Sequence, residues 1–86
     1  MPTISEFYGI LIRIFFDDHN PPHFHAEYQG FMAKFNIQDA SLMEGQFPTR
    51  AKGLVVEWAK TRQKELLEDW ELAKAHAQLK KIDPLE

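Results

Sequence analysis

The stretch HFHAEYQGFMAKFNI, residues 23–37, decides the fold. Apolar residues occupy every second position on both sides of Gln29-Gly30. A period of two is typical of a strand with one buried face, and a two-residue loop that ends in glycine favours a tight hairpin turn. The pattern predicts that residues 23–28 pair antiparallel with residues 31–36. The side chains expected to face inward are those of Phe24, Ala26, Tyr28, Phe31, Ala33 and Phe35.

Two further strands are expected around this hairpin. Residues 9–16, GILIRIFF, are rich in β-branched and aromatic side chains, which favours a strand with its even positions, Phe16 included, facing inward. Residues 41–45 are expected to form a short further strand. Residues 79–86 are too short for a core of their own, so they either add an edge strand or hang free.

The segment that follows Pro48 has the periodicity of helices. One apolar stripe and then a second one recur at helical spacing, but the second is rotated by roughly 100° from the first. A break or bend is therefore expected between Lys60 and Lys64. The two stripes are Ala51, Leu54, Val55 and Trp58, and then Leu66, Trp70, Ala73 and Ala77.

These patterns predict a single α+β domain over residues 1–86. The expected architecture is an antiparallel meander of three to four strands packed against one bent or two consecutive C-terminal helices. A chain of 86 residues with 44% hydrophobic residues can build one small core, which leaves little room for a deep enzyme cleft.

The composition limits the cellular locations and the classes of binding partner that we expect. The net charge is −3 and no basic stripe stands out, so the charge gives RNA or DNA binding no support. The chain has no cysteine, which excludes disulfides and thiolate metal sites. Its beginning lacks the basic and apolar regions of a signal peptide, and no apolar run is long enough to cross a bilayer. We expect a cytoplasmic protein without a membrane partner.

The residues that could carry chemistry are three histidines, His19, His23 and His25, beside Asp17 and Asp18. His23 and His25 are expected on one side of a strand, one pleat apart. Imidazole titrates near neutral pH, so all three histidines are candidates for acid–base catalysis. Alternatively, His23, His25 and Asp18 could hold a metal ion, since three protein ligands and an open position suit catalytic zinc.

The expected strand register favours a different use of the histidines. It places Arg13 and Lys34 on the same face as His23 and His25, and two fixed cations repel a divalent metal ion. Such a set suits an anion, such as a phosphate or the carboxylate of a partner protein. We therefore expect no metal and no cofactor. A purely structural use of the histidines also stays open.

Several segments resemble one known family across nearly the whole chain. They are PTISEFYGI at residues 2–10, DHNPPHFHA at 18–26, EWA at 57–59, EL at 65–66 and WEL at 70–72. Together they are similar to the small prokaryotic domain-of-unknown-function family 4160. The resemblance implies a gene pair of toxin–antitoxin type, with a small partner protein encoded by the adjacent gene. It implies no catalytic residues.

Two functions of different class follow. The first is an interaction module, one half of a toxin–antitoxin-like or stress-related two-gene system, that acts by protein–protein contact. The alternative is a small hydrolase or ribonuclease that uses His19, His23 and His25 with or without a metal. The sequence does not decide whether the chain is an enzyme, nor whether it forms a homo-oligomer.

Overall fold

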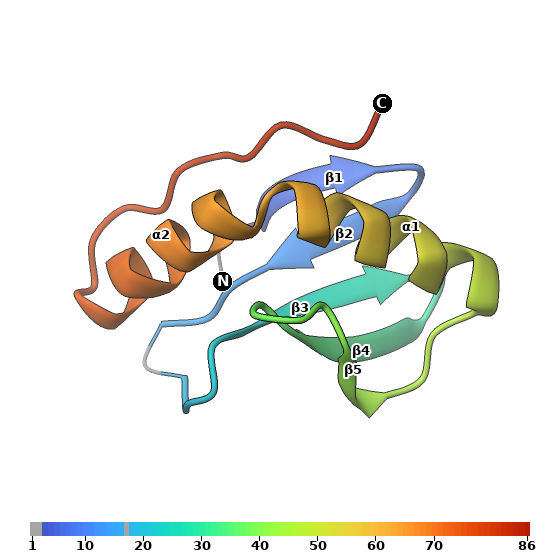
Figure 1. Cartoon of the computed structure of the whole chain (residues 1–86), viewed down its shortest axis with the longest axis horizontal. Helices are drawn as coiled ribbons and strands as arrows, with labels where there is room; N and C mark the ends of the chain where they lie inside the picture. The colour runs from blue at the N-terminus through green and yellow to red at the C-terminus, as the bar shows by residue number, and fades with distance from the viewer. Residues whose placement is uncertain (1–2, 17) are drawn as a thin grey trace.

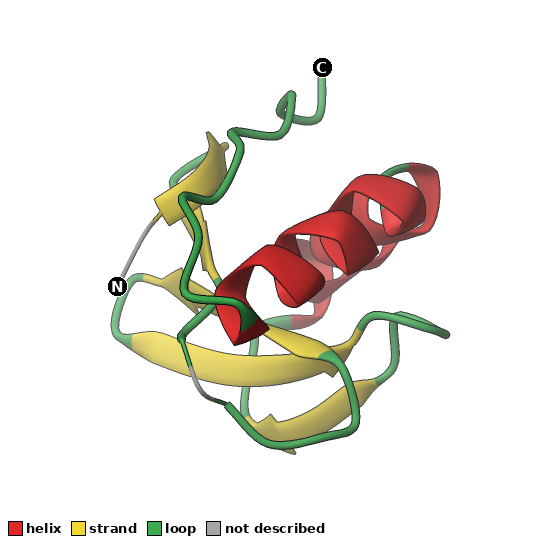
Figure 2. Ribbon diagram, turned by 90° about the vertical axis from the view of Figure 1, so that its left-hand side faces the viewer, coloured by secondary structure: helices red, strands yellow, loops and turns green. Residues whose placement is uncertain are grey.

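The computed structural model describes residues 3–16 and 18–86. Five antiparallel strands form one sheet in the order β1-β2-β3-β4-β5, and two consecutive helices cover one of its faces (Figures 1 and 2). The strands are β1 (Thr3–Phe7), β2 (Ile10–Arg13), β3 (His23–Tyr28), β4 (Phe31–Asn36) and β5 (Leu42–Gly45), and the helices are α1 (Thr49–Thr61) and α2 (Gln63–Lys74). The predicted α+β class is confirmed.

The central hairpin forms with the predicted register, but the expected inward position of Phe31, beside the turn, is wrong because its side chain is exposed. β3 pairs with β4 from His23 opposite Asn36 to Tyr28 opposite Phe31. Gln29 and Gly30 both have positive φ, +47° and +86°, as a type I′ turn requires. The rings of Phe24 and Phe35 stack beneath the helices with their centroids 5.5 Å apart, and both side chains are fully buried.

The break in the helical region is also confirmed. α1 ends at Thr61 and α2 begins at Gln63, and between them Arg62 leaves the helical conformation with φ −109° and ψ 21°. The break lets each half bury its own tryptophan. The second stripe ends earlier than expected, because α2 ends at Lys74 and Ala77 lies beyond it. No helix within residues 3–16 and 18–86 is both long enough and apolar enough to span a membrane.

The sheet has one strand more than the three to four expected. β1 precedes the first predicted strand and pairs with β2, with a register shift between Thr3 and Ser5. β2 is also shorter than predicted and ends at Arg13. Because the extended backbone does not continue, the expected inward position of Phe16 is wrong: its side chain is exposed.

The C-terminal segment, residues 77–86, lies along β1 and the helices as an irregular strap (Figure 1). It neither forms a strand nor hangs free. The Ile82 amide donates to the Ile4 carbonyl at 2.8 Å, and the indole N–H of Trp58 donates to the Asp83 carbonyl at 2.8 Å. The strap thus covers the β1 edge of the sheet.

Asp69 of α2 is buried where the strap crosses the helix. Its Oδ1 accepts the Lys80 amide at 2.9 Å, and its Oδ2 is buried with no hydrogen-bond partner among the described residues. Burial is the main cause that raises the pKa of Asp69 above its ordinary value of 3.8. The folded state therefore holds this proton more tightly than the unfolded state, and stability falls as pH rises through the folded pKa.

We expect Asp69→Asn to stabilise the protein at pH 7, because the amide keeps the acceptor for Lys80 and removes the buried charge. The gain should shrink as pH falls towards 4, where Asp69 itself becomes neutral. Urea unfolding midpoints of both proteins at pH 7 and pH 4 measure this. A destabilisation of equal size at both pH values would contradict it.

Candidate functional site

The histidines lie at the end of the sheet where β3 begins. Pro21 and Pro22 come directly before β3, which begins at His23. The peptide bond between Asn20 and Pro21 is cis. The loop before these prolines carries Asp18 back over the start of β3. Three side chains from eight consecutive residues thereby meet, and we call Asp18, His23 and His25 the histidine cluster.

The cluster is closely spaced around one carboxylate oxygen. Asp18 Oδ2 lies 2.9 Å from His23 Nε2 and 3.1 Å from His25 Nε2. The His25 contact is a hydrogen bond. The His23 contact is short enough for an ion pair, but Nε2 does not have hydrogen-bond geometry towards the oxygen and is buried without a hydrogen-bond partner in the described part of the chain. A hydrogen bond is directional, so the short His23 contact is not one.

The tautomer of the neutral His23 ring follows from its other nitrogen. Nδ1 lies 2.9 Å from the Pro21 carbonyl oxygen. A carbonyl oxygen can only accept, so Nδ1 carries the hydrogen. In the neutral ring, Nε2 then presents a bare lone pair to the interior of the cluster.

In the histidine cluster, burial and hydrogen bonding act in opposite directions on the pKa values of His25 and Asp18. Burial, partly offset by the hydrogen bond to Asp18, lowers the pKa of His25 below 6.5, which favours the neutral imidazole. Burial alone would raise the pKa of Asp18. The His25 hydrogen bond, the His19 backbone amide and the nearby imidazoles outweigh it, so that this pKa lies below 3.8. At neutral pH the cluster is therefore an ionised carboxylate beside a neutral His25.

The cationic face proposed from the sequence is present only in part. Arg13, His25 and Lys34 are neighbours across β2, β3 and β4, as the register predicted. However, Arg13 pairs with Glu27 at 2.9 Å and Lys34 lies 3.7 Å from Glu44, so both cations already have carboxylate partners.

The structure does not place every candidate histidine in the cluster or on an open face. His23 is buried: it is 4% exposed, and its ring centroid is 5.3 Å from that of Trp70 in α2. His19 is exposed and contributes only its backbone to Asp18. Asp17 lies outside the described residues.

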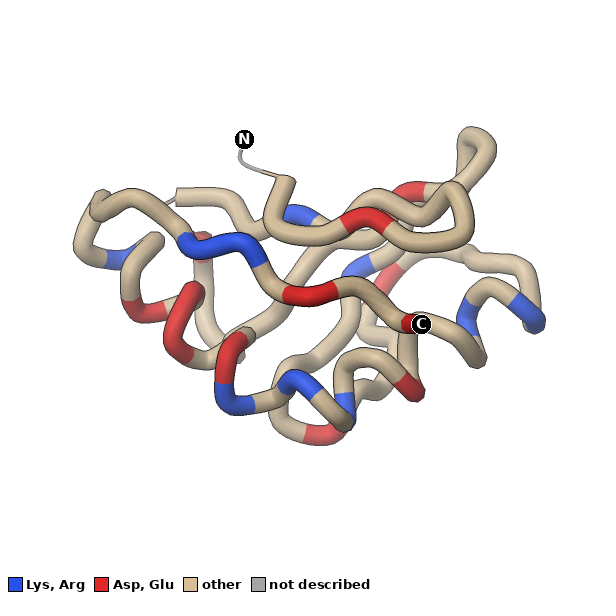
Figure 3. The backbone as a smooth tube through the Cα atoms, turned by 90° about the horizontal axis from the view of Figure 1, so that it is seen from above, with Lys and Arg blue, Asp and Glu red and all other residues tan. Residues whose placement is uncertain are grey.

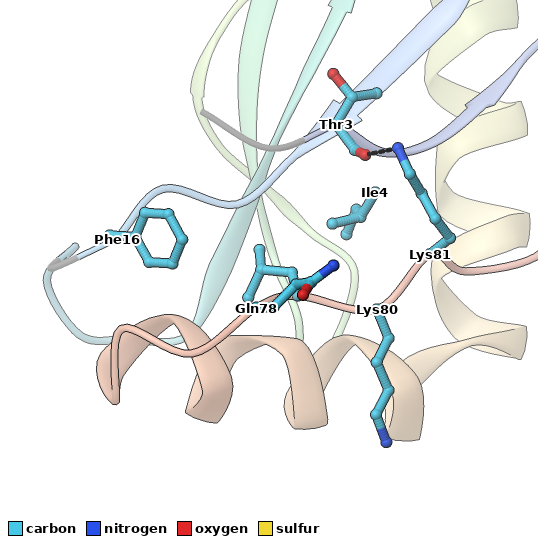
Figure 4. A pocket seen from close by; sticks show the side chains of 7 residues that line it. Thr3, Ile4, Phe16, Gln78, Lys80 and Lys81 are labelled. Atoms are coloured by element: carbon cyan, nitrogen blue, oxygen red, sulfur yellow. Dashed lines mark hydrogen bonds between the residues drawn. The ribbon is translucent and has the colours of Figure 1, made fainter.

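One surface hollow, about 440 Å³, lies between β1 and the strap and is lined by no residue of the cluster (Figure 4). Its lining residues are Thr3, Ile4, Phe16, Gln78, Leu79, Lys80 and Lys81. The Lys81 ammonium donates to the Thr3 carbonyl across it, as the dashed line shows. This hydrogen bond holds the strap against β1, so the lysine in the hollow has a structural role.

A second hollow, about 380 Å³, opens where α1 begins, and we call it the α1 hollow. It is lined by Tyr8, Ile10, Tyr28, Pro48, Arg50, Ala51 and Leu54. Tyr8, in the β1–β2 turn, is 60% exposed. Arg50 is exposed and forms no ion pair with any described residue. The basic positions at the start of α1 stand at one end of the molecule (Figure 3).

The α1 hollow was not predicted from the sequence, although one local signal pointed to it. The first turn of α1 contains no acidic residue, and its Pro48 cap makes no side-chain hydrogen bond. Acidic and capping side chains stabilise the start of a helix, and cations there are unfavourable. Arg50 in this position therefore indicates a use other than helix stability.

The comparisons with known proteins agree with the resemblance seen in the sequence. The model of the domain of unknown function DUF4160 matches residues 9–71, well over half of the chain. This range includes the whole histidine cluster and all residues of the α1 hollow except Tyr8. Neither the curated proteins nor the solved structures contain a match. The chain belongs to the DUF4160 family of domains of unknown function.

Proposed function

We propose that this chain is a protein-binding module whose α1 hollow holds an acidic segment of a small partner protein. The observation that carries the proposal is the hollow itself, which combines two tyrosines, a proline and a leucine with an arginine that forms no ion pair with any described residue. Aromatic residues and arginine are enriched among the hot-spot residues that contribute most of the binding energy of protein interfaces. The partner that the family resemblance suggests is the product of the adjacent gene, in a cytoplasmic pair of toxin–antitoxin-like or stress-related type.

Charge complementarity sets the chemistry of the partner segment. Arg50 forms no ion pair with a carboxylate of the described chain. The amides of Thr49, Arg50 and Ala51 have no acceptor within α1, since the first helical hydrogen bond is that from Lys52 to Pro48. A carboxylate at this place would satisfy both the guanidinium and the amides. An adjacent apolar side chain of the segment would pack between Tyr8 and Tyr28.

The hydrolase stays as the second candidate, and the hydrogen bond that His25 donates to Asp18 is what favours it. An ionised carboxylate that orients an imidazole is a common element of acid–base catalysis. His25 also lines a hollow of about 280 Å³ on the uncovered face of the sheet, with Phe15 and Lys34. Asp18 and His23 do not line it, so a substrate there would meet only one of the three groups. We therefore prefer the binding module.

The sharpest test reverses the charge of Arg50. Co-expressed with the protein of the adjacent gene, the wild-type chain should co-purify with it. Arg50→Glu should weaken the complex about 30-fold, the size of effect that a central arginine produces in an interface. Tyr8→Ala should also weaken it, and because Tyr8 is exposed the fold should stay intact. Titration calorimetry of the separately purified proteins gives the dissociation constants.

Lys52→Glu is the matched control. It makes the same charge change in the same turn of α1, but two helical residues are separated by about 200° around the axis and Lys52 does not line the hollow. We expect a change of less than about 3-fold, since exposed rim charges contribute little to affinity. Equal losses for Arg50→Glu and Lys52→Glu, or wild-type protein that does not bind, would overturn the proposal. If the wild-type protein has phosphodiesterase activity and His25→Ala abolishes it, that result would instead support the hydrolase.

A further inference from the structure

We propose that the histidine cluster binds one divalent transition-metal ion of the zinc type, with Asp18, His23 and His25 as its three protein ligands. This inference does not depend on the proposed binding function, because the α1 hollow shares no residue with the cluster. The ion would tie the loop that contains Asp18 to the start of β3.

The positions of the ligand atoms fit such an ion. One carboxylate oxygen and two imidazole nitrogens lie within 4.8 Å of one another, and the oxygen is 2.9 and 3.1 Å from the two nitrogens. In a tetrahedral zinc site with bonds of about 2.0–2.1 Å, neighbouring ligand atoms are about 3.3 Å apart. The two distances from the Asp18 oxygen are close to this value.

The state of His23 is the independent observation that points to a metal. Its side chain is 5% exposed, and its Nε2 is buried without a hydrogen-bond partner in the described segments. Meanwhile its Nδ1–H donates to the Pro21 carbonyl. Metal-binding histidines commonly donate their second nitrogen to a backbone carbonyl or a carboxylate, which fixes the tautomer and aims the lone pair at the ion. A buried lone pair beside a carboxylate is otherwise unfavourable.

The charges around the cluster also favour a cation over an anion. The cluster contains an ionised carboxylate, and the two fixed cations on this face, Arg13 and Lys34, are each close to a glutamate. An anion would have to approach the Asp18 carboxylate. Two imidazoles and one carboxylate suit zinc, copper, nickel or iron, whereas magnesium and calcium prefer oxygen ligands alone.

Burial indicates that the ion would stabilise the fold rather than bind a substrate. His23 and Asp18 are 5% and 19% exposed in their side chains, and neither lines the hollows described above. The two ends of the loop, Asp18 and His23, would be joined through the ion. Binding to the folded state alone raises the apparent stability with the logarithm of the free ion concentration once that concentration exceeds the dissociation constant.

The test uses untagged full-length protein, stripped with a chelator, dialysed and titrated with Zn²⁺. We expect one Zn²⁺ per chain and a rise in the melting temperature that Mg²⁺ at the same concentration does not produce. Asp18→Asn and His25→Ala should each weaken Zn²⁺ binding at least 10-fold. Both positions are partly exposed, so these variants should fold even if His23→Ala does not.

His19→Ala is the matched control, because this histidine lies in the same loop and its side chain is exposed outside the cluster. It should keep wild-type affinity for Zn²⁺. Absence of saturable Zn²⁺ binding at micromolar concentration would overturn the proposal, as would binding that persists in both Asp18→Asn and His25→Ala. Neither result would affect the Arg50 experiment.

Discussion

Replacement of Trp58 by alanine is expected to lower the free energy of unfolding by about 3–5 kcal/mol, the cost typical of deleting a buried aromatic side chain. Trp58 is 1% exposed and its ring lies 5.2 Å from that of Phe7 and 5.9 Å from that of Phe24. Its indole N–H also holds the strap through the Asp83 carbonyl. One side chain thus joins α1 to β1, β3 and the C-terminal segment.

The loss is large for a chain of this size, whose total stability is expected to be about 4–13 kcal/mol. Chemical unfolding followed by circular dichroism measures it. Trp58→Phe is the control, since it keeps an aromatic ring in the core and removes the hydrogen bond to the strap, and it should cost clearly less. A cost below about 1 kcal/mol for Trp58→Ala would show that α1 is not anchored through this residue.

Gly45→Ala is expected to cost about 2–4 kcal/mol and to detach β5 from the sheet. Gly45 has φ +92°, and a β-carbon there would overlap the Met32 carbonyl oxygen and lie 3.0 Å from the Ala33 α-carbon. Both obstacles are backbone atoms of β4, which cannot move without breaking the ladder between β4 and β5. Strained backbone of this kind costs about 1–3 kcal/mol before the clash is counted.

Gly30→Ala separates the clash from the backbone conformation. Gly30 has a similar φ of +86°, but a β-carbon there would meet nothing within 4 Å. We expect it to cost about 1 kcal/mol, from the conformation alone. Equal costs for the two variants, measured by chemical unfolding, would contradict the packing of β5 against β4.

Local pattern was sufficient to predict the hairpin and the helix break. In the hairpin, the alternation of apolar residues and the Gln29-Gly30 turn specify the same register, and a slip by one residue would expose the whole apolar set. In the helices, the change of phase between the two stripes has no other simple solution than a break near Arg62. Both predictions rest on residues close together in the chain.

β1 was missed because its pattern is interrupted. Ile4 and Ser5 are both buried although they are neighbours, since the register shifts between Thr3 and Ser5. A bulge of this kind removes the period of two by which a strand is recognised. Only the partner strand shows that residues 3–7 belong to the sheet.

The sequence also related His23 to His25 on one strand, but it grouped His19 with them, which lies outside the cluster, and it could not place Asp18. Strand geometry relates His23 to His25, whereas the inward turn of Asp18 depends on the path of a loop with two prolines. The α1 hollow depends on contacts between segments still farther apart. It forms only when the β1–β2 turn, the hairpin and the start of α1 come together.

Amide hydrogen exchange of the chain, alone and in complex with the protein of the adjacent gene, tests the proposed function most directly. In the free chain, the amides of Thr49, Arg50 and Ala51 have no acceptor within α1 and should exchange rapidly. The account predicts that the complex protects these three amides, together with those around Tyr8 and Tyr28. Protection confined to the uncovered sheet face around His25 and Lys34, with the start of α1 unchanged, would contradict it.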